Sequence, residues 1–162
     1  MTTPSKIQRR ADLQEILERE RRGGRSVALA NGLFDLLHVG HVRYLEAAAR
    51  EASVLVVGIN SDASAAALKG PGRPILPQDE RAEIIAALGC VGYVFIFDEP
   101  NVEETLRLLR PDVHCKGTDY THETVPERET VLGYGGRIAI VGDPKDHASR
   151  DLIREIARRF KS

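Results

Sequence analysis

The chain has 162 residues, a length that suits one domain with a sizeable buried core. Hydrophobic residues make up 42% of it and charged residues 29%, and a formal net charge of -1 argues against a nucleic-acid partner or a membrane-surface partner. No apolar run approaches the length of a membrane-spanning helix, and the first residues lack the apolar core of a signal peptide, so we expect a cytoplasmic protein. We expect Cys90 and Cys115 to be reduced, buried thiols.

An amphipathic segment in residues 7–22 opens the chain, and short apolar runs then alternate with helical patterns. The runs that predict strands are residues 27–30, 54–58, 93–97, 112–115 and 138–141. The helical patterns are residues 42–50, 61–68, 78–88, 102–109, 125–133 and 150–160. This alternation is typical of parallel strands joined by right-handed crossovers, with helices on both faces of the sheet. We therefore predict a single-domain α/β fold: a doubly wound, Rossmann-like parallel sheet of five strands in the order 3-2-1-4-5, in residues 25–162, preceded by an N-terminal helix in residues 1–24.

Two histidines stand where the first predicted strand turns into a helix. They are His38 and His41, at the end of the segment Asn-Gly-Leu-Phe-Asp-Leu-Leu-His-Val-Gly-His that begins at Asn31. The first N–H groups of a helix attract anions, Gly40 lets a ligand approach the backbone, and imidazole N–H groups can bond to phosphate oxygens. The pattern indicates phosphate binding. The alternatives are histidines that only satisfy local hydrogen bonds, or a zinc site, for which no nearby cysteine or third histidine completes the ligand set.

This segment, with the Tyr-Leu pair at 44–45, resembles the His-x-Gly-His signature of the nucleotidyltransferase superfamily, and specifically of its cytidylyltransferase-like branch. The resemblance implies that His38 and His41 stabilise a nucleoside triphosphate and its α-phosphate during attack by a substrate phosphate. It implies Mg²⁺ as the cofactor, bound through the triphosphate and water, with no dedicated metal site in the protein. Asp35 is assigned to the acceptor, although it could also contact the nucleotide or a hydrated metal, or cap the turn. Nucleotide-binding roles are implied for Asn31, Gly32, Phe34 and Gly40.

Two further segments resemble phosphate-binding parts of the family. The segment Lys116-Gly117-x-Asp119-Tyr120 matches the one that closes over the nucleotide, with Lys116 near the phosphates and with Gly117 and Asp119 at the nucleotide. The order 3-2-1-4-5 would bring this segment and the histidines to one crevice. The alternative for Lys116 is a solvated loop charge. Arg81 is expected to bind the phosphates through its planar guanidinium group. The alternative is an exposed ion pair of Arg81 with Asp79 or Glu80.

Residues suited to acceptor recognition lie after the second predicted strand and in the Gly/Pro-containing loop of residues 69–74. The resemblance covers the chain from residue 25 to the last helix, and it is closest to the adenylyltransferases that act on heptose 1-phosphate. It implies acceptor-binding roles for Asn60, Asp62, Lys69 and Arg73. A structural reason is sufficient for part of this region, because Ser61 or Asn60 can cap the helix that follows.

Two segments depart from the family pattern at places that the pattern assigns to phosphate binding. Ser26 stands where the family has a lysine, and only Arg25 could supply the missing charge. The residues His-Ala-Ser-Arg at 147–150 stand where a Ser-Thr-Thr signature opens the last helix. We expect Ser149 to cap that helix and, with Arg150, to bind the nucleotide. The alternative for Arg150 is a surface ion pair with an aspartate at 146 or 151.

The predicted activity is a nucleotidyl transfer. A nucleoside monophosphate, AMP from ATP, passes to a sugar phosphate such as heptose 1-phosphate, and pyrophosphate leaves. The expected partners are these two small substrates, and we expect a homodimer. Two alternatives stay open: a CTP-dependent cytidylyltransferase acting on glycerol 3-phosphate or a similar alcohol phosphate, and a non-catalytic nucleotide-binding module.

Overall fold

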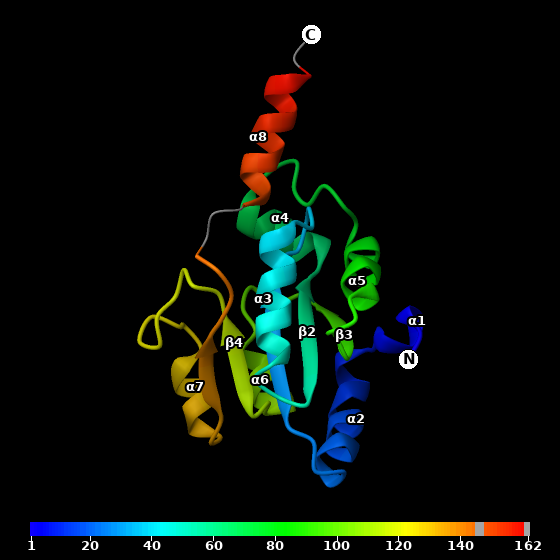
Figure 1. The fold of residues 1–162 in the computed structure, drawn as a ribbon, viewed down its shortest axis with the longest axis vertical. Coiled ribbons are helices and arrows are strands. Elements are labelled where there is room, and N and C mark those ends of the chain that lie inside the picture. Colours follow the sequence, from blue (N-terminus) through cyan, green and yellow to red (C-terminus); the bar gives the residue numbers. More distant parts are fainter. Residues whose placement is uncertain (145–147, 161–162) are drawn as a thin grey trace.

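A five-stranded parallel sheet forms the centre of the protein, as a computed structural model of residues 1–144 and 148–160 shows (Figure 1). The strand order is β3-β2-β1-β4-β5, which confirms the predicted order. All neighbouring pairs are parallel, so each connection crosses over the sheet and carries at least one helix. The strands are β1 (Val27–Gly32), β2 (Val54–Asn60), β3 (Tyr93–Phe97), β4 (Val113–Lys116) and β5 (Arg137–Ile140).

Helices cover both faces of this sheet. Their bounds are α1 (Thr3–Lys6), α2 (Arg10–Arg22), α3 (Val39–Ala49), α4 (Asp62–Lys69), α5 (Gln78–Ala87), α6 (Glu103–Leu109), α7 (Arg128–Gly133) and α8 (Ser149–Arg159). Helices α3 and α5 pack on one face, whereas α2, α6 and α7 pack on the other. Helix α8 contributes no buried residue and extends away from the sheet beyond the carboxyl ends of the strands (Figure 1).

The two cores follow directly from the alternation of side chains along a strand. On β1, Ala28 and Ala30 face the core shared with α3 and α5, while Val27 and Leu29 face the core shared with α2 and α6. The N-terminal helix α2 belongs to the second core through two leucines, Leu13 and Leu17, that have no solvent exposure. The apolar face predicted for residues 7–22 is therefore the surface by which this segment packs on the sheet.

Several element boundaries differ from the prediction. Helix α2 begins at Arg10 rather than at residue 7, because Ile7 is extended and forms a bridge with Val94 beside β3. Strands β1 and β2 run two residues further than their apolar runs, since the parallel pairing continues through Gly32 and Ile59. Helix α7 begins only at Arg128. No helix in the described residues is long and apolar enough to cross a membrane.

The carboxyl ends of the strands gather the loops that matter for function. The pairing of Ala30 with Cys115 places the ends of β1 and β4 side by side. The loop after β1 leads to both histidines, and β4 itself ends at Lys116. The topology therefore brings the two predicted phosphate-binding segments to the same edge of the sheet, at the point where the strand order reverses.

Candidate active site at the carboxyl edge of the sheet

The two histidines form a stacked pair at the start of α3. His38 is the N-cap residue of this helix, and the backbone N–H of His41 donates to the His38 carbonyl oxygen at 2.9 Å. The ring centroids lie 3.8 Å apart with an interplanar angle of 24°. The pair thus lies where the helix dipole favours an anion, as the sequence predicted.

Gly32 and Phe34 support this pair from the strand side. Phe34 has a φ of 48°, which is unusual for a residue with a side chain, and its ring is buried. A Cβ at Gly32 would lie 3.1 Å from the Phe34 ring, so the glycine leaves the space into which the ring folds back. The Phe34 ring in turn meets His41 edge to face at a centroid distance of 5.2 Å. Phe34 thus packs against His41, and direct nucleotide contact by Gly32 or Phe34 stays a prediction.

Tyr44 ties the histidine helix to β4, a connection that the sequence reasoning missed. Its hydroxyl donates to the carbonyl oxygen of Cys115 at 2.9 Å. Burial raises the pKa of Tyr44 far above its ordinary value, so the hydroxyl keeps its proton. The available signal was spacing, because Tyr44 follows His41 by three residues and therefore lies next to it on the same side of α3.

Lys116 is buried at the end of β4, with a side chain that is 9% exposed, so the alternative of a solvated loop charge is wrong. Its ammonium lies 3.4 Å from a carboxylate oxygen of Glu127 and 4.7 Å from the centroid of the Tyr120 ring. Burial acts to raise the pKa of Glu127, but His114 and the Lys116 charge outweigh it and lower that pKa to about 2. Glu127 therefore stays ionised, and it was missed by the sequence reasoning because it lies outside the motif.

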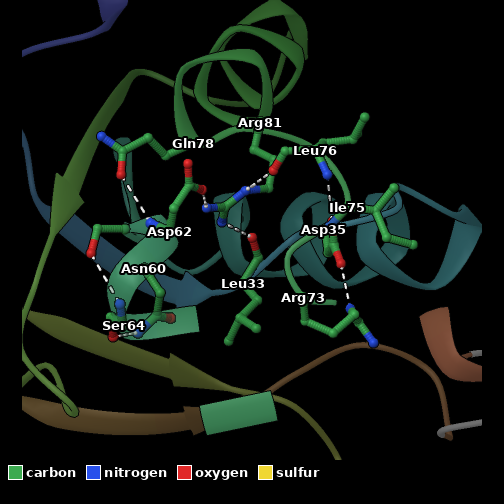
Figure 2. Close-up of polar contacts among 11 residues, drawn as sticks. Leu33, Asp35, Asn60, Asp62, Ser64, Arg73, Ile75, Leu76, Gln78 and Arg81 are labelled. Carbon is green, nitrogen blue, oxygen red and sulfur yellow. Dashed lines mark hydrogen bonds and ion pairs between the residues drawn. The ribbon is translucent and has the colours of Figure 1, made fainter. Parts of the chain in front are cut away.

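Arg81 is fully buried beneath the loop that follows β1 (Figure 2). Its guanidinium donates to the carbonyl oxygens of Leu76 at 3.0 Å and Leu33 at 2.6 Å, and it pairs with Asp62 at 2.8 Å. The alternative of an exposed ion pair with Asp79 or Glu80 is therefore wrong. In this position Arg81 joins three segments at the carboxyl edge, while its contact with phosphates stays a prediction.

Asp35 anchors the loop that precedes α5. Its carboxylate is 1% exposed and accepts hydrogen bonds from Arg73 Nε at 2.6 Å and from the backbone N–H groups of Ile75 and Leu76 at 2.8 and 3.0 Å. Burial acts to raise the pKa of Asp35, but these bonds outweigh it and the net shift is downward. The structure thus brings the predicted acceptor residues Asp35 and Arg73 together as a pair (Figure 2).

Of the remaining predicted acceptor residues, Asn60 and Asp62 lie near Arg81, whereas Lys69 lies at the surface. Ser61 caps α4 by accepting from the N–H of Ser64 at 3.2 Å, which settles the cap in favour of Ser61. Asn60 is buried and donates to the Ser64 hydroxyl at 3.0 Å, while Asp62 reaches Arg81. Lys69 is exposed in the last turn of α4. Acceptor contacts by these residues stay predictions.

The C-terminal helix contacts the histidine loop through Ser149. The predicted cap at this residue is wrong, because Ala148 is the N-cap residue and the Ser149 hydroxyl donates instead to the Leu36 carbonyl oxygen at 3.3 Å. Arg150 follows with a side chain that is 75% exposed and 3.9 Å from Asp151. The predicted partner Asp146 and the segment residue at 147 lie outside the described residues.

Arg25 cannot replace the positive charge of the family lysine, whose position Ser26 occupies. The expectation that Arg25 could supply this charge to the phosphate site is therefore wrong. Both residues precede β1 and therefore lie at the amino edge of the sheet, whereas His38 follows the carboxyl end of the same strand. Six residues of extended chain span about 20 Å. Arg25 is instead paired with Glu20 at 2.9 Å and bonded to the Ser53 carbonyl oxygen.

The loop after β4 adds two residues to the site. A Cβ at Gly117 would lie 2.9 Å from a carboxylate oxygen of Asp119, so the glycine permits the close approach of that side chain. Within residues 1–144 and 148–160, His, Cys, Asp and Glu side chains form no group of three that could hold a metal ion.

Comparison with known proteins places these features in a family. The family model described as cytidylyltransferase-like matches residues 29–155. A curated relative called "Bifunctional protein HldE" from Syntrophotalea carbinolica is 48% identical over 157 residues, which covers 97% of this chain and 32% of the relative. A protein of the same name from Trichlorobacter lovleyi is 44% identical over 96% of this chain and also 32% of its own length. The chain thus spans about a third of the curated relatives it matches.

A solved structure agrees with this assignment. The lipopolysaccharide core biosynthesis protein from Thermoplasma volcanium GSS1 superposes with a TM-score of 0.61 at 25% sequence identity, over 75% of this chain and 100% of that one. The family match includes both histidines, Arg81 and Lys116, and it extends into α8. The chain therefore belongs to the cytidylyltransferase-like family.

Proposed function

We propose that this chain is a nucleotidyltransferase that transfers AMP from ATP to a sugar phosphate such as heptose 1-phosphate and releases pyrophosphate. The observation that carries the proposal is the stacked pair of His38 and His41 at the N-terminus of α3. Relatives named HldE and a solved lipopolysaccharide core biosynthesis protein support a sugar phosphate as the acceptor.

The proposed reaction needs no nucleophile from the protein. A phosphate oxygen of the acceptor attacks the α-phosphorus of ATP, the bond from that phosphorus to the bridging oxygen breaks, and pyrophosphate leaves with the bonding electrons. Negative charge grows on the α- to γ-phosphates during this step. His38, His41 and Lys116 would stabilise that charge, and a scaffold held by Tyr44 and Arg81 costs little reorganisation at the moment of reaction.

Mg²⁺ fits this proposal as a partner of the triphosphate. The described residues offer no cluster of three ligating side chains, and the Asp35 carboxylate already accepts three hydrogen bonds from the chain. The cation would therefore be held mainly by phosphate oxygens and water, and it would supply further charge neutralisation there.

We also propose that the protein acts as a homodimer in the cytoplasm. Helix α8 carries Leu152 and Ile156, and Phe160 follows at its C-cap, so that the three lie four residues apart and all are exposed. A second copy could cover this apolar stripe. Sedimentation of the wild type and of Ile156→Asp tests the dimer, since the substitution should shift a dimer toward the monomer and should leave a monomer unchanged.

Measurement of pyrophosphate release tests the proposed activity and distinguishes it from the two alternatives, a cytidylyltransferase and a non-catalytic nucleotide-binding module. ATP and CTP are each offered with heptose 1-phosphate, other sugar 1-phosphates and glycerol 3-phosphate. Release that needs ATP and a sugar phosphate supports the proposal, whereas release that needs CTP and an alcohol phosphate indicates a cytidylyltransferase. Nucleotide binding by calorimetry without release under any pairing would indicate a non-catalytic module.

A further inference from the structure

Two buried ionisable residues, Glu127 and His114, lie beside Lys116 and were given no role in the reaction described above. Glu127 immediately precedes α7, and one oxygen of its carboxylate lies 3.4 Å from the Lys116 ammonium and 3.6 Å from Nε2 of His114. His114 has no solvent exposure, and the side chains of Glu127 and Lys116 are 5% and 9% exposed. Three titratable groups therefore share one nearly dry space at the end of β4.

The backbone of this region fixes where the Lys116 side chain begins. The N–H of Val141 donates to the Lys116 carbonyl oxygen at 2.8 Å, which extends the pairing of β4 with β5. The side chain itself has four flexible bonds, so the strand alone does not determine the position of the ammonium. In this structure a carboxylate and an aromatic ring determine it, at 3.4 Å and 4.7 Å from the nitrogen.

The charge balance of the cluster favours a specific pair. Burial lowers the pKa of His114, and the nearby Lys116 charge lowers it further against the opposing effect of Glu127, so His114 stays neutral. Glu127 is then the buried carboxylate that compensates the Lys116 ammonium. A buried ion pair contributes little net stability, but it holds its members in one geometry, because separating them would leave an uncompensated charge.

We propose that Glu127 is a positioning residue, which holds the Lys116 ammonium against the Tyr120 ring in the orientation that meets the triphosphate. This inference rests on the proposed function, in which Lys116 stabilises charge on the phosphates. Glu127 does not touch the substrate and acts through Lys116.

The proposal predicts a division between binding and turnover that a purely structural role would not produce. Removing the Glu127 charge takes away the buried partner of the Lys116 side chain, which is then less restrained. The attraction between the site and ATP is then unchanged or stronger, because a negative charge near the phosphates has gone. The kcat falls, because the Lys116 ammonium is no longer held in the position in which it stabilises the phosphate charge.

The test compares Glu127→Gln with the control Glu129→Gln in kcat, in KM for ATP and in thermal midpoint. Glu129 lies two residues further along, has a side chain that is 89% exposed and pairs with Arg128 instead of Lys116. We expect Glu127→Gln to lower kcat about tenfold or more with an unchanged or lower KM for ATP, and Glu129→Gln to match the wild type. In a Lys116→Met background, Glu127→Gln should cause no further loss of kcat, since the group it positions is absent.

A second measurement reads the geometry without activity. The sequence has five lysines, so the ammonium signal of Lys116 can be assigned in ¹⁵N-lysine NMR spectra as the one that Lys116→Met removes. We expect a signal with slow hydrogen exchange in the wild type and in Glu129→Gln, and fast exchange in Glu127→Gln. An unchanged signal and unchanged kcat in Glu127→Gln would overturn the proposal, as would losses that add in the double variant. If the wild type releases no pyrophosphate with any substrate pair, the proposed function fails, and the NMR comparison still decides whether Glu127 holds Lys116.

Discussion

Replacement of Arg81 by methionine tests whether this residue is mainly a scaffold or mainly a phosphate ligand. Methionine keeps much of the side-chain volume and removes every donor. In the wild type, the fully buried guanidinium bonds to the carbonyl oxygens of Leu33 and Leu76 and pairs with Asp62. Arg81→Met leaves both carbonyl oxygens without these donors.

The size of the effect follows from these three contacts. Loss of the charged hydrogen bond to each of these two part-buried carbonyl oxygens costs about 1.5–3 kcal/mol. The pair with Asp62 adds less than about 1 kcal/mol, because the Asp62 side chain is 45% exposed and regains water. The free energy of unfolding should therefore fall by about 3–7 kcal/mol, and the melting temperature by at least roughly 6 °C for a domain of this size.

Urea unfolding followed by circular dichroism measures this change, with calorimetric titration of ATP as the second readout. Glu80→Gln is the matched control, because Glu80 is exposed beside Arg81 on α5, and its free energy of unfolding should stay within about 1 kcal/mol of the wild type. If Arg81→Met keeps the stability of the wild type within about 1 kcal/mol but loses ATP affinity, the scaffold interpretation is refuted and Arg81 is a phosphate ligand.

Three further predictions concern the histidines and the last helix. His38→Ala and His41→Ala should each lower kcat about a hundredfold or more with little change in melting temperature, whereas a destabilised protein with normal turnover would contradict their catalytic role. Burial lowers the pKa of His114 below its ordinary value of 6.5, so the unfolded state binds more protons than the folded state as the pH falls below that value. The free energy of unfolding, measured with urea, should therefore decrease from pH 7.5 to pH 5.5, and it should decrease less in His114→Gln. Arg150→Ala should weaken ATP binding about tenfold in calorimetry, whereas Arg154→Ala, which removes the other partner of Asp151, should leave the affinity unchanged. Equal affinities for the wild type and both variants would show that Arg150 is a solvated surface residue without a role in ATP binding.

The sequence by itself determined the elements and their order. Alternating apolar runs and helical patterns predicted five parallel strands with crossover connections, because these signals come from local periodicity and from short-range rules of chain connection. The order 3-2-1-4-5, one of those that a doubly wound sheet can adopt, was chosen as well and is the observed one. The position of His38 and His41 at a helix start was also readable, since a strand, a break and a helical pattern follow one another within a few residues. The errors at this level were boundaries, such as the start of α2, and the short helix α1, which was not predicted as a separate element.

Only the tertiary structure decided which polar groups meet. Arg81 bonds to Leu33, which is 48 residues away, and Asp35 bonds to Arg73, which is 38 residues away. Lys116 pairs with Glu127, which lies outside the recognised motif. Arg25 lies at the edge of the sheet opposite the phosphate site to which the sequence analysis had assigned its charge. These partners are set by the loops that the crossovers bring to one edge and by the need of each buried charge for a compensating group there. Neither condition leaves a periodic trace along the chain, so a single sequence predicts where the site lies but not how its charges are paired.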